Sequence, residues 1–328
     1  KMNYKNGGFY MIVKMNMGLK RLIVTVLAIS LLISGLSLNA LASEGESGEK
    51  IVIVNEDGSI EYETIYPRSE GIQLNFDSIN DSSQSSNFQD DNQISTYASS
   101  GYVNISEDAS QYAPYRYACY ITSTFPNGEK IASSGIRVGR NVILVSAHSV
   151  WNDEKGGGST STLIGVGTYF MGDGSLKCRD GSIPRQRLIL HEDWTKNQMA
   201  TADWALLVIS DEYVTENFNL FQKYGYVNEF SKGIGRKVTL IGYPGGDKFC
   251  YSKGEIDGTT DYKWNDKYKG LWTATSKSDL GLSGGAVIDD ETGVLIGIVK
   301  GKDSGLFGKN AIVPLTSKIT DVILQYAH

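Results

Sequence analysis

Short runs of apolar residues alternate with turns rich in Gly, Asn and Asp over residues 102–315. The runs have the length of about four to eight residues and the enrichment in β-branched side chains that are typical of the strands of a sandwich or barrel. We therefore expect an all-β domain, with strands near residues 117–121, 131–138, 142–145, 163–166, 206–209, 238–241, 286–288 and 294–299.

Two local patterns refine this expectation. Residues 289–293, with Gly293 at their end, should form the loop of a β-hairpin. The last segment alone has helical periodicity, because Ile319, Val322, Ile323 and Tyr326 recur at the spacing of one helix face. Thr316 or Ser317 precedes this segment as a candidate N-cap.

The first segment has the organisation of an export signal. Lys20 and Arg21 precede the apolar run Leu22–Ile33, and Ala40-Leu41-Ala42 supplies a cleavage motif. We expect residues 1–42 to be a signal peptide, with translation starting at Met11, Met15 or Met17. A membrane anchor is the alternative, because residues 22–41 are about as long as a bilayer-spanning helix.

The second segment, residues 43–101, is predicted to be a propeptide followed by a polar linker. Ile51–Val54 and Ile60–Tyr62, separated by a polar turn, form a candidate hairpin. Residues 78–100 are almost all Ser, Asn, Asp and Gln, which bury too little apolar surface to offset the entropy of ordering the chain. A flexible spacer that is never cut is the alternative. Residues 102–328 are left as the main domain.

Charge follows the same three segments. The formal net charge is −6, composed of +5 over residues 1–42, −10 over residues 43–100 and −1 over residues 101–328. Nucleic-acid binding needs a concentrated cationic face, so this function is excluded. With only 3 His and 3 Cys, a Cys-rich zinc module is excluded as well.

Ser283 is the candidate nucleophile, within Gly281-Leu282-Ser283-Gly284-Gly285 just before a strand. Flanking glycines allow a sharp turn that exposes the Ser Oγ. The N–H groups of Gly281 and Ser283 would then form an oxyanion hole. Taken alone, an ordinary Gly/Ser turn explains the motif equally well.

His148 and Asp203 are the candidate base and orienting acid. His148 follows the apolar run Val142–Val145, and Asp203 precedes the apolar run 204–209, so both lie at strand ends. A structural histidine and a solvated aspartate are the alternatives for each residue by itself. The order His148, Asp203, Ser283 in an all-β chain is that of the two-barrel serine proteases.

These residues and their surroundings resemble the glutamyl-endopeptidase (V8-type) branch of the chymotrypsin-like serine proteases. The matching stretches are Tyr112-Ala113-Pro114, Ser146–Val150, Ala202–Leu207, Ile241–Gly245 and Gly281–Val287. The resemblance implies two antiparallel six-stranded β-barrels with a C-terminal helix. It implies a secreted zymogen, monomeric and without cofactor, that is cut by a maturing protease and hydrolyses polypeptide substrates. In this interpretation His148 accepts the proton of Ser283, and Asp203 orients the imidazole.

Substrate preference is where the sequence departs from that branch. The branch carries a His that contacts the acidic substrate side chain. Val299 stands at that place, and we expect Val299 and the following Lys300 to contact the substrate. Ser278 is retained where the branch has a pocket hydroxyl, and Lys277 beside it could pair with an acidic P1 side chain. Solvated surface lysines at positions 277, 300 and 302 are the alternative.

Other chemistries find little support in the sequence. Cys119, Cys178 and Cys250 leave open one disulfide with one free thiol, or three free thiols, and none lies in a Gly-rich turn beside a base. No second His stands at metal-ligand spacing from His191, so no metal site is expected. A catalytically silent binding protein and a highly target-selective protease are the competing functions.

Overall fold

The computed structural model describes residues 3–5, 8–10, 48–67, 101–215, 221–227, 229–260, 269–302 and 310–327. The apolar core of the predicted signal peptide and the polar tract 78–100 lie outside these residues. The chain divides into two units, Lys1–Ser47 and Gly48–His328. In the first unit, β1 (Asn3–Lys5) and β2 (Gly8–Tyr10) pair antiparallel.

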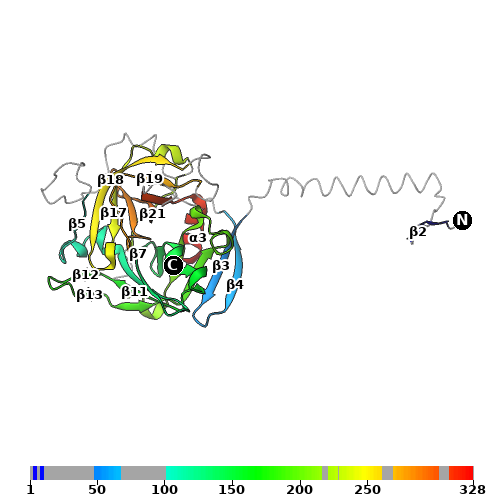
Figure 1. Ribbon diagram of the computed structural model, residues 1–328, viewed down its shortest axis with the longest axis horizontal. Helices are drawn as coiled ribbons and strands as arrows, with labels where there is room; N and C mark the ends of the chain where they lie inside the picture. The colour runs from blue at the N-terminus through cyan, green and yellow to red at the C-terminus, as the bar shows by residue number, and fades with distance from the viewer. Residues whose placement is uncertain are drawn as a thin grey trace. The chain divides into compact units, whose positions relative to one another are not determined.

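The second half of the larger unit contains a closed six-stranded barrel. Each strand pairs antiparallel with the next, and the last one returns to the first. In order around the barrel the strands are β17 (Lys237–Gly242), β20 (Ala286–Asp289), β21 (Leu295–Lys302), β22 (Asn310–Pro314), β19 (Trp272–Ala274) and β18 (Cys250–Thr259). The short strand β5 (Val103–Asn104) is added beside β18. Figure 1 shows these strands, mostly yellow to orange, in one half of the unit.

The first half is built on a nine-stranded antiparallel sheet. Its order is β14 (Ser182–Pro184), β11 (Ser161–Val166), β6 (Ala118–Thr124), β7 (Lys130–Arg137), β8 (Val142–Val145), β16 (Ala205–Val208), β15 (Arg187–His191), β3 (Glu49–Asn55) and β4 (Ile60–Ile65). Two small strand pairs accompany it: β9 (Trp151–Asn152) with β10 (Gly157–Gly158), and β12 (Thr168–Phe170) with β13 (Leu176–Cys178). The closed barrel and the large sheet confirm the expected all-β, chymotrypsin-like two-barrel architecture.

Helices are few. The C-terminal helix α3 (Ser317–Tyr326) confirms the periodicity, and Thr316 caps it by accepting a hydrogen bond from the Ile319 N–H. The six-residue helix α2 (Glu192–Asn197) is not anticipated by the sequence pattern. The 3₁₀ turns are η1 (Ala109–Gln111), η2 (Tyr115–Tyr117), η3 (Ala147–Ser149), η4 (Asp153–Lys155), η5 (Ala200–Ala202), η6 (Asp211–Tyr213), η8 (Phe230–Gly233) and η9 (Pro244–Gly246). No helix in the described ranges has both the length and the apolar character to span a membrane.

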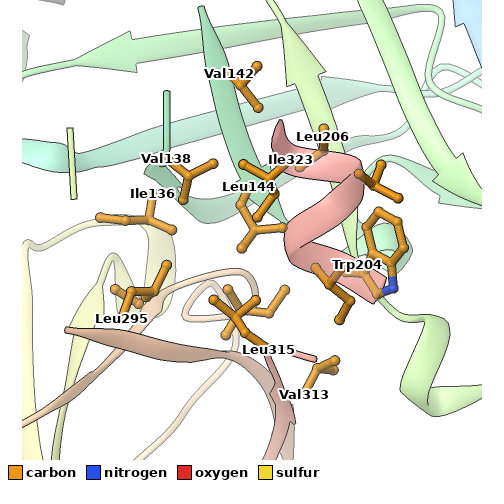
Figure 2. Packing of buried hydrophobic residues seen from close by; sticks show 14 of the residues in the cluster. Ile136, Val138, Val142, Leu144, Trp204, Leu206, Leu295, Val313, Leu315 and Ile323 are labelled. Carbon is orange, nitrogen blue, oxygen red and sulfur yellow. The ribbon is translucent and has the colours of Figure 1, made fainter. Parts of the chain in front are cut away.

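The largest core cluster joins the two halves. Figure 2 shows Ile323 of α3 among residues of the large sheet, such as Leu144, and residues of the barrel and the segment after it, such as Val313 and Leu315. All four side chains are at most 1% exposed. Burial of this apolar surface is the main source of stability, and it fixes the two halves against each other.

Candidate active site

His148 lies at the end of a rigid strand. All four residues of β8 have 0% exposure, and the chain then turns through Ser146 into η3, which carries His148. The Ser146 Oγ donates to the Val299 carbonyl at 3.0 Å, which ties this turn to β21 of the barrel. The His148 side chain retains 32% of its exposure, so a buried scaffold presents a partly open imidazole.

Asp203 is the partner of this imidazole. It follows η5, precedes β16 and has 0% exposure. His148 Nδ1 lies 2.8 Å from Asp203 Oδ2 and 3.1 Å from Oδ1, and the His148 backbone N–H donates to Oδ1 at 2.9 Å. Three contacts to one buried carboxylate fix the orientation of the ring and direct Nε2 away from the acid.

Lys300 brings a second cation to the same carboxylate. Its Nζ lies 3.5 Å from Asp203 Oδ2, and its side chain is 15% exposed. The pairing of β21 with β22 shifts register between Val299 and Gly301, and Lys300 is the extra residue. Such a bulge turns a side chain out of the regular alternation of the strand. The lysine predicted to contact substrate is therefore placed against the buried acid.

The pKa of Asp203 reflects this environment. Burial by itself raises the pKa, because it penalises the charged form. The charge of His148, the hydrogen bonds from His148 and the charge of Lys300 act in the opposite direction and prevail, so the pKa is lowered. The carboxylate is thus held ionised.

Ser283 occupies a sharp turn between Gly281 and Gly284. Both glycines have positive φ, +91° and +80°, a conformation that side-chain-bearing residues rarely adopt. A Cβ on Gly284 would lie 2.2 Å from the Ser134 carbonyl oxygen and 2.8 Å from the Ser146 nitrogen. The glycine therefore allows the Ser283 turn to pack directly against the strand end that leads to His148.

The Ser283 side chain connects to the acid–histidine pair through Lys300. Its Oγ donates to the Lys300 carbonyl at 3.2 Å, and the following Gly284 N–H donates to the Val299 carbonyl at 2.8 Å. Lys300 thus contacts Ser283 with its backbone and Asp203 with its side chain. Among the described residues, the Ser283 Oγ is hydrogen-bonded to the Lys300 carbonyl and not to His148 Nε2, so Ser283 and the His148–Asp203 pair are connected through Lys300.

Ser134 of β7 supports the nucleophile turn from the other half of the molecule. Its N–H donates to the Ser283 carbonyl at 2.9 Å, and its Oγ donates to the Gly281 carbonyl at 2.8 Å. The same Oγ accepts the Tyr243 N–H at 2.8 Å. Ser134 is 0% exposed, so these bonds form in a site without bulk water. Nothing in the sequence singles out this residue, since Ser133 and Ser134 are two serines within a predicted strand, without a glycine-rich motif or a charged neighbour.

The proposed oxyanion donors are available. Within the described residues, neither the Gly281 nor the Ser283 N–H donates to another group. The hydrogen bond from Ser134 to the Gly281 carbonyl restricts the orientation of the backbone just before Ser283. Two such N–H groups beside a nucleophile can stabilise the charge that develops on a carbonyl oxygen.

Two of the predicted substrate-contacting residues, Lys277 and Ser278, lie on the segment that leads into the Ser283 turn. Ser278 is 0% exposed, and its Oγ has no hydrogen-bond partner among the described residues. The Lys277 Nζ lies 3.7 Å from Asp279 Oδ2 and 4.7 Å from the centre of the Tyr102 ring. Lys302 reaches the same Asp279 at 3.4 Å. Val299 is 0% exposed and packs within a core cluster of the barrel.

The three cysteines are all free, which decides between the two alternatives left by the sequence. Burial raises the pKa of Cys119 to about 12 and that of Cys250 to about 11. Both thiols therefore stay protonated at neutral pH, which is the unreactive form.

Comparison with known proteins agrees with this geometry. A family model described as a trypsin-like peptidase domain matches residues 133–298, which include His148, Asp203 and Ser283. No curated protein matches the chain significantly.

Solved structures give the fold independently. A Glu endopeptidase superposes with a TM-score of 0.55 at 19% identity, covering 70% of this chain and 97% of that one. The protease Anisep from Arthrobacter nicotinovorans gives 0.50 at 15% identity, covering 65% and 95%. HL collagenase gives 0.50 at 16% identity, covering 64% and 92%.

The fold and the family match define the class: the molecule is a trypsin-like serine endopeptidase, a hydrolase of peptide bonds. The chain belongs to the trypsin-like peptidase domain family.

Proposed function

We propose that the chain cleaves polypeptides by acyl transfer through Ser283, His148 and Asp203. The observation that carries this assignment is the contact of 2.8 Å between His148 Nδ1 and the buried, ionised Asp203. With its Nδ1–H donated to Asp203, the imidazole has an unprotonated Nε2 that can accept the Ser283 proton. Ser283 then attacks the scissile carbonyl, and the Gly281 and Ser283 N–H groups stabilise the oxyanion.

The imidazolium then donates its proton to the leaving amine, which completes acylation and leaves the acyl group on the Ser283 Oγ. In deacylation water attacks the acyl carbonyl while His148 takes the proton of the water. The imidazolium returns this proton to the Ser283 Oγ as the acid product leaves. The reaction needs no cofactor.

We further propose that the enzyme is secreted and prefers acidic P1 residues, as expected for the V8-type branch. The signal peptide at residues 1–42, the propeptide at 43–101 and the protease domain at 102–328 belong to this proposal. The Glu endopeptidase among the structural neighbours agrees with the preference. The charges near Ser278 agree too: among the described residues, Lys277 and Lys302 both pair with Asp279, so two positive charges face one carboxylate.

Peptide profiling tests both parts of the proposal. Quenched peptides that differ only at P1 (Glu, Asp, Gln, Leu or Lys) are compared by kcat/KM. We expect Glu to exceed its neutral isostere Gln by about tenfold or more, the size of one charge-assisted contact. Ser283→Ala should lower kcat/KM by at least about four orders of magnitude on every peptide.

Two lysine variants separate a pocket charge from general surface charge. Lys277→Met should reduce the Glu/Gln ratio several-fold, whereas Lys196→Met, on the exposed face of α2, should leave it unchanged. Equal rates for Glu and Gln would contradict the acidic preference alone. Full activity of Ser283→Ala would contradict the catalytic assignment, and an inactive wild-type chain would indicate a silent binding protein.

A further inference from the structure

The hairpin β3–β4, which comprises residues 49–65, forms one end of the large sheet, with β3 as an interior strand and β4 as the edge. β3 pairs with β15 over five residue pairs, from His191↔Ile51 to Arg187↔Asn55, and with β4 on its other side. The partners of β15 in the described residues are β16 and β3. Removal of the hairpin would leave one edge of β15 unpaired, with Leu188, Ile189 and Leu190 along it.

The side chains of β3 are buried on both faces of the sheet. Ile51, Val52, Ile53 and Val54 are 0–7% exposed. Ile51 and Ile53 belong to the core cluster that contains α3, while Val52 and Val54 belong to the second cluster of the large sheet. A continuous apolar run buried on both faces is typical of an interior strand. The exposed edge is β4, where Ile60 is 49% and Tyr62 is 71% exposed.

Polar contacts hold both strands of the hairpin, at its open end, to residues of the predicted protease domain. Glu49 accepts from His191 Nε2 at 2.7 Å and pairs with Lys318 Nζ of α3 at 2.6 Å. The Tyr326 hydroxyl of α3 donates to Glu63. Burial raises the pKa of Glu49, but the hydrogen bonds and charges of His191 and Lys318 outweigh burial and lower it, which shows that the charged form is satisfied.

The contact between Glu49 and His191 also connects the hairpin with helix α2, which lies beside His148. His191 Nδ1 caps α2 by accepting the Asp193 N–H at 3.0 Å, so its Nε2 carries the hydrogen donated to Glu49. α2 carries Trp194, whose ring centre lies 6.5 Å from that of His148. The hairpin therefore supports the helix that packs beside the candidate general base.

We propose that residues 49–65 remain bound to the protease domain as a non-covalent strand pair after the tract between residues 67 and 101 is cut. The surface that holds them is the edge of β15 together with α3, and the mature enzyme is then a two-chain molecule. This inference rests on the proposed processing of residues 43–101, but it does not depend on which residues cleave the substrate.

The test uses the full chain with Ser283→Ala, so that self-cleavage cannot contribute. The recognition sequence of a site-specific endoprotease replaces part of the polar tract 78–100, and the cut product is passed over a size-exclusion column at micromolar concentration. We expect the two fragments to co-elute in equal amounts by mass spectrometry, and to separate in guanidinium chloride. Loss of the hairpin fragment in native buffer would overturn the proposal.

A matched pair of variants tests whether the buried contacts hold the fragment. Ile53→Asp places a charge in the core cluster, whereas Ile60→Asp makes the same change on the exposed edge. We expect Ile53→Asp to lower the retained fraction at least about tenfold and Ile60→Asp to leave it unchanged. Should Ile53→Asp prevent folding, Glu49→Gln, which removes only the charge, should still weaken retention severalfold. Equal retention in all of these variants would overturn the proposal.

Discussion

Lys300 gives the site a feature that a Ser–His–Asp arrangement does not require. One buried carboxylate is shared by the imidazole of His148 and the ammonium of Lys300. The lowered pKa of Asp203 keeps this carboxylate ionised at the pH of activity. The charge of Lys300 is one of the causes of this lowered pKa, so Lys300 helps to keep the carboxylate in its charged form.

Removal of this cation should shift the acid limb. In Lys300→Met the Asp203 carboxylate loses one of the charges that lower its pKa, so it accepts a proton at higher pH. Because the mechanism needs Asp203 ionised, we expect the acid limb of kcat/KM to move to higher pH. Lys300→Arg keeps the charge and should retain the wild-type profile. An unchanged acid limb in Lys300→Met would show that Lys300 does not influence the ionisation of Asp203.

At the residue scale the sequence predicts His148, Asp203 and Ser283 as candidates, and it does not predict the contact of Lys300 with Asp203. His148, Asp203 and Ser283 could be found because each stands beside an apolar run or a Gly-rich turn. The contact of Lys300 with Asp203 depends on a register shift between β21 and β22, which the pattern of apolar residues does not record. The sequence by itself therefore predicts only a substrate contact for Lys300.

Among the secondary-structure elements, β7 links the two halves at the nucleophile. Ser134 on this strand bonds the Ser283 and Gly281 carbonyls and the Tyr243 N–H. It touches no substrate atom in the proposed mechanism, so it is a positioning residue. We expect Ser134 to affect the rate of the reaction by fixing the orientation of the turn that carries Ser283.

Ser134→Ala tests this link. The change leaves the buried Tyr243 N–H without its partner, which costs about 1–3 kcal/mol in the free energy of unfolding. We expect kcat to fall about tenfold with KM nearly unchanged, because the turn loses orientation while the substrate pocket remains.

The neighbouring Ser133 supplies the control for this variant. Ser133 is 1% exposed, and its Oγ has no hydrogen-bond partner among the described residues. Ser133→Ala should leave kcat at the wild-type value. A kcat for Ser134→Ala equal to that of Ser133→Ala would exclude the positioning role.

Elements were predicted well where they are periodic and poorly where they are short or depend on distant partners. The strand at Val142–Val145, the hairpin loop at Asp289–Gly293 and helix α3 agree with the sequence pattern. Helix α2 has only six residues, less than two full turns, and its cap is a histidine. The hairpin at residues 49–65 could be predicted as a hairpin, but its pairing with β15 could not, because the two strands are far apart in sequence.

At the scale of the whole molecule, the alternation of apolar runs and turns was enough to predict an all-β domain. The closure of one sheet into a six-stranded barrel and the nine strands of the other follow from non-local pairing. The proposed catalytic groups come from both halves: His148 and Asp203 lie beside strands β8 and β16 of the large sheet, while Ser283 lies just before β20 of the barrel. The shared core around α3 therefore determines whether the three residues meet.

The central claim is that Ser283, activated by His148, is the nucleophile of this peptidase. Labelling of the native protein with a fluorophosphonate probe, followed by peptide mapping, tests the claim most directly. We expect one adduct, on Ser283, that is absent in Ser283→Ala and formed at least about a hundredfold more slowly in His148→Ala. An adduct on another residue, or peptidase activity that persists without labelling of Ser283, would contradict the account.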